Sequence, residues 1–357
     1  MALTLTSLIA LHALDLDEVI DVRSPSEYAE DHIPGAVNLP VLNDAERAEV
    51  GTIYVRESRF RARKVGAALV AQNAARHLQT YLADKPGGYR PLVYCWRGGQ
   101  RSNSFATILA QIGWRVEVLE GGYQSYRRLV ARQLYECPFP CKVFLLDGNT
   151  GSAKTDLLLR LPGHGVQVLD LEGLAHHRGS LFGARAGGQP SQKGFESRLA
   201  AAIAGLDPAR PVVIEAESSR IGQCTIPPQL WEVMKPAQRI EIIAPLAERA
   251  KYLTRAYADL IADPALLVAT IRRLAPLHAA KQIDDWQNMA RQGHFAELAA
   301  SLMETHYDPR YSKQRARRDP ANTRLLPLES LSDTALDKGA AALAERVAEL
   351  SDAPLAV

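Results

Sequence analysis

The feature that most limits the fold of this chain is a short apolar segment that leads into a glycine-containing loop and then a helical pattern. The segment spans residues 143–146, and the loop reads Gly148-Asn149-Thr150-Gly151-Ser152-Ala153-Lys154-Thr155. A strand, such a loop and a helix in that order are the context of a Walker A phosphate-binding loop. The loop therefore predicts a parallel α/β domain with a phosphate site at the end of a strand.

Each part of this loop has a predicted chemical role. The backbone amides and the helix N-terminus would cradle a diphosphate or triphosphate, Lys154 would neutralise its outer oxygens, and the Thr155 hydroxyl would reach a Mg²⁺ ion. Ala153 replaces the usual glycine, which is acceptable if that position is already helical. The alternative is a glycine-rich turn that binds nothing. We predict ligand binding by Gly148, Thr150, Gly151, Ser152, Ala153, Lys154 and Thr155.

Carboxylates at the ends of later strands are further candidates for this site. Asp170 and Glu172 follow the strand expected at 166–169, and Glu215 follows the strand expected at 212–214. Any of them would help to hold the metal ion through water, with Glu215 in a Walker B-like position. The alternative for each is a solvated or salt-bridged carboxylate at a strand end.

The pattern along the chain predicts two α/β domains. In the second half, strands at 143–146, 166–169, 212–214 and 240–244 alternate with helices at 155–161 and 195–206, which predicts a mostly parallel sheet. Beyond Pro245 the pattern is helical throughout. We therefore expect a first domain over 1–134, a linker over 135–142, a P-loop domain over 143–245 and a helical region over 246–357.

A second strand–loop–helix unit lies in the first domain. The domain is expected to begin with a strand within residues 1–13, followed later by a helix over 61–82 and a strand over 92–94 that runs into Cys95. The loop reads Cys95-Trp96-Arg97-Gly98-Gly99-Gln100-Arg101-Ser102, and a helix over 102–112 and a strand over 115–119 follow. The same order of elements again predicts an anion site at the end of a strand.

The cysteine loop predicts a reactive thiol. The start of the following helix, together with Arg97 and Arg101, would favour the thiolate of Cys95, and the glycines would let the backbone amides turn toward a bound anion. We predict Cys95, Arg97 and Arg101 as catalytic residues. The alternative is that Cys95 is a buried core cysteine.

With residues 21–28 and 32–38, this loop resembles the rhodanese homology domain. The resemblance implies that Asp21 and Arg23 brace the fold and that Cys95 carries a transferred chalcogen. The loop is Cys-x5-Arg, one residue longer than the commonest sulfurtransferase loop, and rhodanese-fold phosphatases and arsenate reductases share that length. A phosphatase would often have histidine where Tyr94 stands. The longer loop would also suit a larger anion such as selenophosphate.

Composition excludes several classes of protein. The chain has 357 residues, of which 47% are hydrophobic and 23% charged, so it has enough apolar material for two cores. It has no apolar run long enough to span a bilayer. Four scattered cysteines argue against a disulfide framework and for a reducing, cytoplasmic location.

The formal charge of +2 gives no general affinity for nucleic acid, so RNA binding would depend on local clusters. One cluster comprises Arg56, Arg59, Arg61, Arg63 and Lys64. The other, with Tyr307 and Tyr311 interleaved, comprises Arg310, Lys313, Arg315, Arg317 and Arg318. Such patches meet phosphates, and aromatic side chains stack on unpaired bases. The alternative for each cluster is a solvated helix face.

Both loops in one chain, with the segments 170–183, 189–196 and 215–222, resemble the tRNA 2-selenouridine synthase family. The resemblance implies that the wobble 2-thiouridine of tRNA is geranylated by geranyl diphosphate and that selenium from selenophosphate then replaces the geranylthio group. It also implies ligand contacts by His177 and Arg178, Mg²⁺ at the diphosphate, and a partner enzyme that supplies selenophosphate. An apolar groove containing Leu181 and Phe182 is expected beside the P-loop.

Two alternatives remain open at this stage. One is a P-loop kinase or ATPase fused to a rhodanese-fold phosphatase or sulfurtransferase. The other is a regulatory protein whose inactive rhodanese domain recruits a partner.

Overall fold

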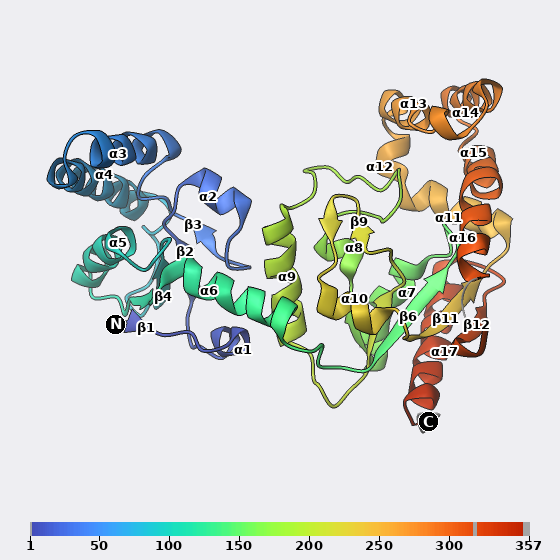
Figure 1. Cartoon of the computed structure of the whole chain (residues 1–357), viewed down its shortest axis with the longest axis horizontal. Coiled ribbons are helices and arrows are strands. Elements are labelled where there is room, and N and C mark those ends of the chain that lie inside the picture. The colour runs from blue at the N-terminus through green and yellow to red at the C-terminus, as the bar shows by residue number, and fades with distance from the viewer. Residues whose placement is uncertain (1, 317–319, 353–357) are drawn as a thin grey trace. The chain divides into compact units, whose positions relative to one another are not determined.

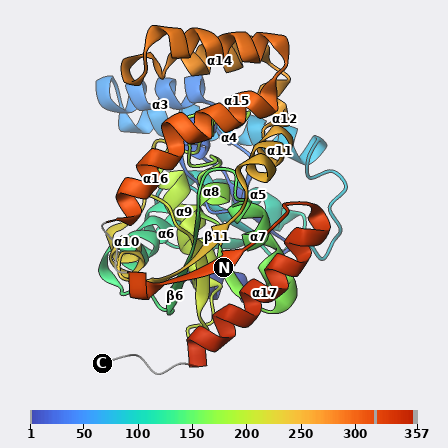
Figure 2. The ribbon, with the colours of Figure 1, turned by 90° about the vertical axis from the view of Figure 1, so that its right-hand side faces the viewer.

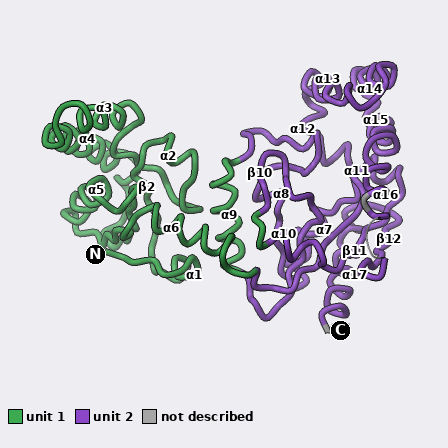
Figure 3. The backbone as a smooth tube through the Cα atoms, viewed as in Figure 1, with its two compact units in different colours: residues 1–138, 190–205, 227–229 green, residues 139–189, 206–226, 230–357 purple. Residues whose placement is uncertain are grey.

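The two predicted α/β patterns form two separate five-stranded parallel sheets. The computed structural model describes residues 2–316 and 320–352, which divide into two units (Figure 3). Unit 1 runs to Pro138 and includes Pro190–Gly205 and Pro227–Gln229, and unit 2 contains Phe139–Gln189, Leu206–Ile226 and the chain from Leu230. The chain first crosses from unit 1 to unit 2 between Pro138 and Phe139, within the residues 135–142 that were expected as a linker.

The sheet of unit 1 has the strand order β1-β5-β4-β2-β3, and all its pairs are parallel. Its strands are β1 (Ala2–Leu3), β2 (Glu18–Asp21), β3 (Val37–Asn38), β4 (Pro91–Tyr94) and β5 (Glu117–Leu119). The helices of unit 1 are α1 (Leu8–His12), α2 (Pro25–Glu30), α3 (Asp44–Arg56), α4 (Arg59–Gln79), α5 (Gln100–Gln111), α6 (Gly122–Ala131), the π-helical turn η1 (Arg132–Glu136) and α9 (Gln192–Ala204).

Most of the N-terminal segment is not the expected strand. Only Ala2–Leu3 pairs with β5, and Leu8–His12 is the helix α1. The Ser7 side chain accepts a hydrogen bond from the amide of Ala10 at 3.3 Å and so caps the helix. A serine cap before a short apolar run starts a helix as readily as the run extends a strand, which is why the expectation was wrong.

The sheet of unit 2 has the order β12-β11-β6-β8-β7, again with parallel pairs throughout. Its strands are β6 (Val143–Gly148), β7 (Gln167–Leu169), β8 (Val212–Glu215), β11 (Gln238–Ile243) and β12 (Thr323–Pro327). The short strands β9 (Arg220–Ile221) and β10 (Cys224–Thr225) form an antiparallel hairpin. The phosphate loop follows β6, which has neighbours on both sides in the sheet.

Among the helices of unit 2, α13–α15 lie beyond one end of this sheet, whereas α7 and α17 pack together against one of its faces (Figures 1 and 2). Their bounds are α7 (Lys154–Arg160), η2 (Leu161–His164), α8 (Leu171–Leu174), α10 (Pro228–Met234), α11 (Leu246–Ala256), α12 (Ala258–Ile261), α13 (Pro264–Arg272), η3 (Ala275–Leu277), α14 (Ala280–Gln292), α15 (Phe295–Leu302), η4 (Met303–Tyr307), α16 (Asp308–Arg315), η5 (Pro320–Asn322) and α17 (Asp333–Asp352).

The region after Pro245 is not entirely helical, because β12 extends the sheet beside β11. Along β12, Leu326 is buried while Leu325 is 60% exposed. A short edge strand with a single buried side chain gives a weak sequence signal, and the long helical pattern around it obscured that signal.

Helix α9 lies between two strands of unit 2 in the sequence but packs in unit 1, against α1 and α6. The Ser197 hydroxyl donates to Asp31 Oδ2 at 2.9 Å, and Glu196 pairs with Arg127. The helix therefore contributes buried polar partners to unit 1, although its position in the sequence placed it in the P-loop domain.

Candidate functional site

The phosphate loop lies at the carboxyl end of β6, which is where open parallel sheets bind their ligands. Gly151 has a φ of +81°, and a Cβ there would lie 3.0 Å from both the Arg249 carbonyl oxygen and the Leu253 side chain. Only glycine fits such a position, so the close approach of α11 to the loop depends on it.

The residue before the lysine has a conformation that the sequence analysis did not expect. Ala153 is not helical but left-handed, with φ 60° and ψ 30°. This is the conformation that glycine adopts at low cost and alanine adopts under strain. The glycine usual in this motif therefore serves a backbone requirement that alanine meets here at some cost in stability.

Lys154 begins α7 and lines a cleft of about 980 Å³. Its ammonium group donates to the carbonyl oxygen of Gly148 at 3.1 Å. Burial alone would lower the pKa of Lys154, but Tyr311 and the carboxylates around it, including Glu217 and Glu172, raise it. The side chain is thus a fixed cation beside the loop, as the motif predicts.

Thr155 brings the carboxylates of two strand ends together. Its hydroxyl donates to Glu215 Oε1 at 2.6 Å, and Glu172 Oε2 lies 3.2 Å from the same oxygen. Burial, then repulsion from neighbouring carboxylates, raises the pKa of Glu172 and of Glu215. The same two causes raise the pKa of Glu217 to about 7. This acidic cluster comprises Glu172, Glu215 and Glu217.

The acidic cluster and Thr155 fit a divalent cation. Glu215 Oε2 is buried without a hydrogen-bond partner among the described residues, and a cation or its bound water would satisfy it. Within residues 2–316 and 320–352, no group of three or more His, Cys, Asp or Glu side chains would hold a metal ion by itself. Mg²⁺ would instead take Thr155 and phosphate oxygens as ligands, with the carboxylates bound through water.

Of three other residues predicted to contact the ligand, one lines the cleft and two do not. Arg178 lines the cleft, where it pairs with Asp259 at 2.8 Å and lies 4.7 Å from the ring centroid of Tyr257. Asp170 is the N-cap of α8 and accepts from the amide of Gly173 at 2.7 Å. The buried His177 accepts from the amide of Gly179 at 3.1 Å. Asp170 and His177 thus support the site through local structure and are not among the residues that line the cleft.

An apolar pocket of about 80 Å³ adjoins the cleft. Phe182 lines it, as expected, while Leu181 packs against the surrounding apolar cluster. The other apolar walls come from α11, α12, α13, α15 and η4. The residues that line both cavities are Thr150, Ser180, Leu253, Tyr257 and Tyr307. A phosphate site and an apolar pocket therefore share one wall.

Sequence reasoning missed several residues of the cleft. Tyr252, Tyr257 and Arg185 line it, and Glu217 lies beside Lys154. Glu217 follows Glu215 by two residues just after a strand, a spacing that could have suggested it. The tyrosines belong to the helical region, and no local motif marks them.

The cysteine loop lies at the carboxyl end of β4, between β2 and β5 of unit 1. Backbone amides at the start of α6 hydrogen-bond to the loop. The amide of Tyr123 donates to the carbonyl oxygen of Cys95 at 2.8 Å, and the amide of Gln124 donates to that of Trp96 at 3.1 Å. A Cβ at Gly122, where φ is +57°, would clash with the Cys95 carbonyl oxygen. The start of α6 therefore holds the loop closed.

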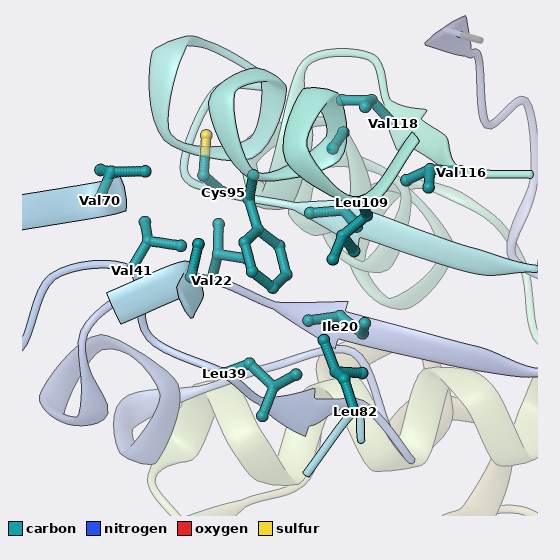
Figure 4. Close-up of a cluster of buried hydrophobic side chains, with 14 of the residues drawn as sticks. Ile20, Val22, Leu39, Val41, Val70, Leu82, Cys95, Leu109, Val116 and Val118 are labelled. Atoms are coloured by element: carbon teal, nitrogen blue, oxygen red, sulfur yellow. The ribbon is translucent and has the colours of Figure 1, made fainter. Parts of the chain in front are cut away.

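Cys95 lies at the edge of the apolar core of unit 1, with its sulfur directed away from Val22 and Val41 (Figure 4). The amide of Gly99 donates to Sγ at 3.3 Å, and the Ser102 hydroxyl lies 3.2 Å from it. Burial alone would raise the pKa of Cys95. Hydrogen bonds from Ser102 and the loop amides outweigh burial and lower the pKa, so the thiolate forms more readily than in an ordinary cysteine.

The two arginines of the loop differ in their surroundings. Arg101 binds Glu27 of α2, with Nη1 2.8 Å from Oε2, so it acts on Cys95 through its charge. Arg97 is exposed. Arg23 makes hydrogen bonds of 2.6 Å to Asp21 Oδ2 and to the Asp31 carbonyl oxygen, which confirms the expected brace. The Tyr94 hydroxyl accepts from the amide of Ile33 at 3.1 Å and is buried, which is a structural role.

All four cysteines are free, as their spacing predicted. No helix in the described part of the chain combines the length and the apolarity needed to cross a membrane.

A cysteine loop in one parallel sheet and a phosphate loop in another define a rhodanese-like domain joined to a P-loop domain. Residues 5–129 match the rhodanese-like domain family, and residues 141–268 match the family described as the tRNA 2-selenouridine synthase AAA domain. The chain belongs to the tRNA 2-selenouridine synthase family, a family of transferases, which confirms the resemblance seen in its motifs.

Similarity to curated members of that family extends over most of the chain. The tRNA 2-selenouridine synthase of Hahella chejuensis is 36% identical over 303 residues, which cover 82% of this chain and 72% of the relative. That of Alcanivorax borkumensis is 33% identical over 332 residues, covering 84% and 90%. That of Aeromonas salmonicida is 37% identical over 258 residues, covering 71% and 68%.

Proposed function

We propose that this chain converts the wobble 2-thiouridine of tRNA into 2-selenouridine in two steps. In the first, the thiouridine sulfur attacks C1 of geranyl diphosphate, a carbon–sulfur bond forms and the diphosphate leaves. The proton on N3 of the ring is lost to solvent. In the second, selenium from selenophosphate displaces the sulfur as geranyl thiol, and water cleaves the phosphorus–selenium bond. Family membership supports the overall reaction.

One observation carries the first step, namely the wall shared by the phosphate cleft and the apolar pocket. An isoprenoid diphosphate has a charged head and an apolar tail, and these two cavities match its two parts in chemistry. Lys154 and the loop amides would bind the diphosphate, and Arg178 adds positive charge to the same cleft. When bound, Mg²⁺ would stabilise the charge that grows on the leaving diphosphate.

The cysteine loop supports the second step. The pKa of its thiol is lowered, and its Cys-x5-Arg length would suit a tetrahedral anion such as selenophosphate. Cys95 would lie beside a bound selenophosphate, whose selenium stays at the selenide level and passes directly to C2 of the nucleoside. The S-alkylated sulfur is a better leaving group than the free thiocarbonyl sulfur, so geranylation prepares the nucleoside for this step.

Mass spectrometry of the wobble nucleoside tests the proposal. Thiolated tRNA incubated with the protein, geranyl diphosphate, selenophosphate and Mg²⁺ should yield 2-selenouridine. Without selenophosphate it should yield S-geranyl-2-thiouridine. Calorimetry should show geranyl diphosphate binding more tightly than ATP. Tight ATP binding with no geranyl diphosphate binding would instead support the kinase or ATPase alternative.

A further inference from the structure

The end of α3 and the start of α4 form an exposed corner in unit 1, which we call the α3–α4 corner and define as residues 54–64 (Figure 1). Three large apolar or aromatic side chains are exposed there: Tyr54 by 46%, Val55 by 83% and Phe60 by 77%. Ile53 and Ala62, beside them in sequence, are buried. Each helix thus buries one face in unit 1 and leaves apolar side chains exposed to solvent on another. A cluster of exposed apolar side chains is typical of an interaction site.

The same corner concentrates positive charge. Its five cations are all exposed, and Glu57 is its one acidic residue, which gives a net charge of +4 against +2 for the whole chain. Within the described part of the chain, Arg61 pairs with Glu57, whereas no ion pair of Arg56, Arg59, Arg63 or Lys64 is found. Arg59 lies over the Tyr54 ring at 5.5 Å. Cations and aromatic rings are therefore interleaved on one surface.

This combination favours RNA as the partner. Arginine and lysine bind backbone phosphates, while an exposed aromatic ring stacks on an unpaired base. A helix that lies on a membrane needs an apolar face along its length. Here the exposed apolar side chains are confined to the last turn of α3 and the first turn of α4. Four of the five cations are arginines, whose planar fork suits phosphate.

The second basic cluster, Arg310, Lys313, Arg315, Arg317 and Arg318, differs from the α3–α4 corner in its surroundings. Arg315 pairs with Glu241 at 2.9 Å and also contacts Asn149 of the phosphate loop. Arg310 lines the phosphate cleft. Arg317 and Arg318 lie outside the described residues. Part of that cluster therefore serves the P-loop domain, whereas the corner presents its cations to solvent.

We propose that the α3–α4 corner binds tRNA, with Phe60 stacked on an unpaired base and Arg59 and Arg63 bound to backbone phosphates. The proposal rests on the proposed function, which supplies tRNA as the substrate, and it adds the surface that holds it.

Three variants test this with a full-length tRNA that carries 2-thiouridine at the wobble position. Arg59→Glu with Arg63→Glu should weaken binding at least tenfold at low salt. It should also reduce the slope of log affinity against log salt by about 1.5, since two phosphate contacts are lost. Phe60→Ala should weaken binding about tenfold with an unchanged slope, and Phe60→Trp should restore it.

Matched controls in the same unit are Arg115→Glu, at an exposed cation, and Ile112→Ala, at a side chain 50% exposed. Neither should change tRNA affinity. Equal tRNA affinity in all variants would overturn the inference and leave the proposed function intact, whereas a wild-type protein that binds no tRNA would contradict the proposed function itself. Loss of binding to anionic phospholipid vesicles, with unchanged tRNA binding, would identify the corner as a membrane surface and also overturn the inference.

Discussion

The hydroxyl of Thr155, at the start of α7, donates a 2.6 Å hydrogen bond to Glu215, at the end of β8. Sixty residues separate them in sequence, and the parallel pairing of β6 with β8 brings them together. Glu172 approaches the same hydroxyl from the segment after β7. The predicted metal ligand and the acidic cluster thus form one group, and the charge of that group depends on pH.

Stability in the absence of divalent cations should fall as the pH rises from 5 to 8.5. Burial, then the charges of Glu172 and Asp170, raise the pKa of Glu215 well above its ordinary value of 4.5, so the folded chain keeps a proton that the unfolded chain has lost. The stabilisation is complete below that ordinary value and is lost as the pH rises through the raised pKa. Thermal denaturation with chelator, repeated across this pH range, measures it.

Glu215→Gln removes one carboxylate of the acidic cluster, because the amide still accepts from Thr155 but does not ionise. Its pH dependence should be smaller by a few kcal/mol, at about 1.4 kcal/mol for each unit of pKa shift. Glu49→Gln, on the exposed surface of α3, should leave the dependence unchanged. Mg²⁺ should flatten the wild-type curve, and an identical fall in Glu215→Gln would contradict the assignment.

Ala153→Gly should stabilise the protein by roughly 0.5–1 kcal/mol. Its left-handed conformation costs an alanine more than a glycine, and the greater entropy of the unfolded glycine chain offsets part of the gain. Ala48→Gly, at an exposed helical position in α3, should instead destabilise it by about 0.5–1 kcal/mol. Melting temperatures of the two variants should therefore shift in opposite directions.

Cys95→Ala and Lys154→Ala should block different steps. Without Cys95, S-geranylated tRNA should accumulate with little selenouridine, because diphosphate departure does not require the thiol. Without Lys154, geranylation should be abolished, and selenation would lack its substrate. Nucleoside analysis by mass spectrometry distinguishes the two patterns. Equal loss of both products in a folded Cys95→Ala variant would indicate a single shared active site.

Filling the apolar pocket should weaken geranyl diphosphate binding selectively. Ala299 lines the pocket on α15, and Ala299→Leu would occupy part of it. Affinity for geranyl diphosphate should fall at least tenfold while affinity for inorganic diphosphate stays the same, as measured by calorimetry. Ala296→Leu, on the same helix but outside the pocket lining, is the matched control. Equal weakening of both ligands would place the tail elsewhere.

The strand–loop–helix units of both sites could be predicted from sequence, because each is encoded within a dozen contiguous residues. Cys95, Lys154 and Thr155 are found where their motifs predicted. The conformation of Ala153 was not predictable, since the motif gives the residue type and the closure of the loop determines φ. Asp170 and Glu172 could not be separated, because their roles depend on which of them turns toward Thr155.

The features that could not be predicted depend on contacts between segments that are distant in the sequence. Tyr257 and Tyr307 reach the cleft only because the helical region packs beside the phosphate loop. The exposure of Phe60 is also invisible in sequence, where an aromatic residue in a helix is normally assigned to the core. Strand β12 was hidden by the helical pattern on both sides of it.

The placement of α9 has a consequence for how the protein is made. Unit 1 needs Pro190–Gly205, so it is incomplete when a ribosome has translated only the first 138 residues. The hydrogen bond from the Ser197 hydroxyl to Asp31 and the ion pair of Glu196 with Arg127 can form only after the phosphate loop has been synthesised. The rhodanese-like domain must therefore finish folding around a segment that arrives with the second domain, and a chain cut at Pro138 would lack that segment.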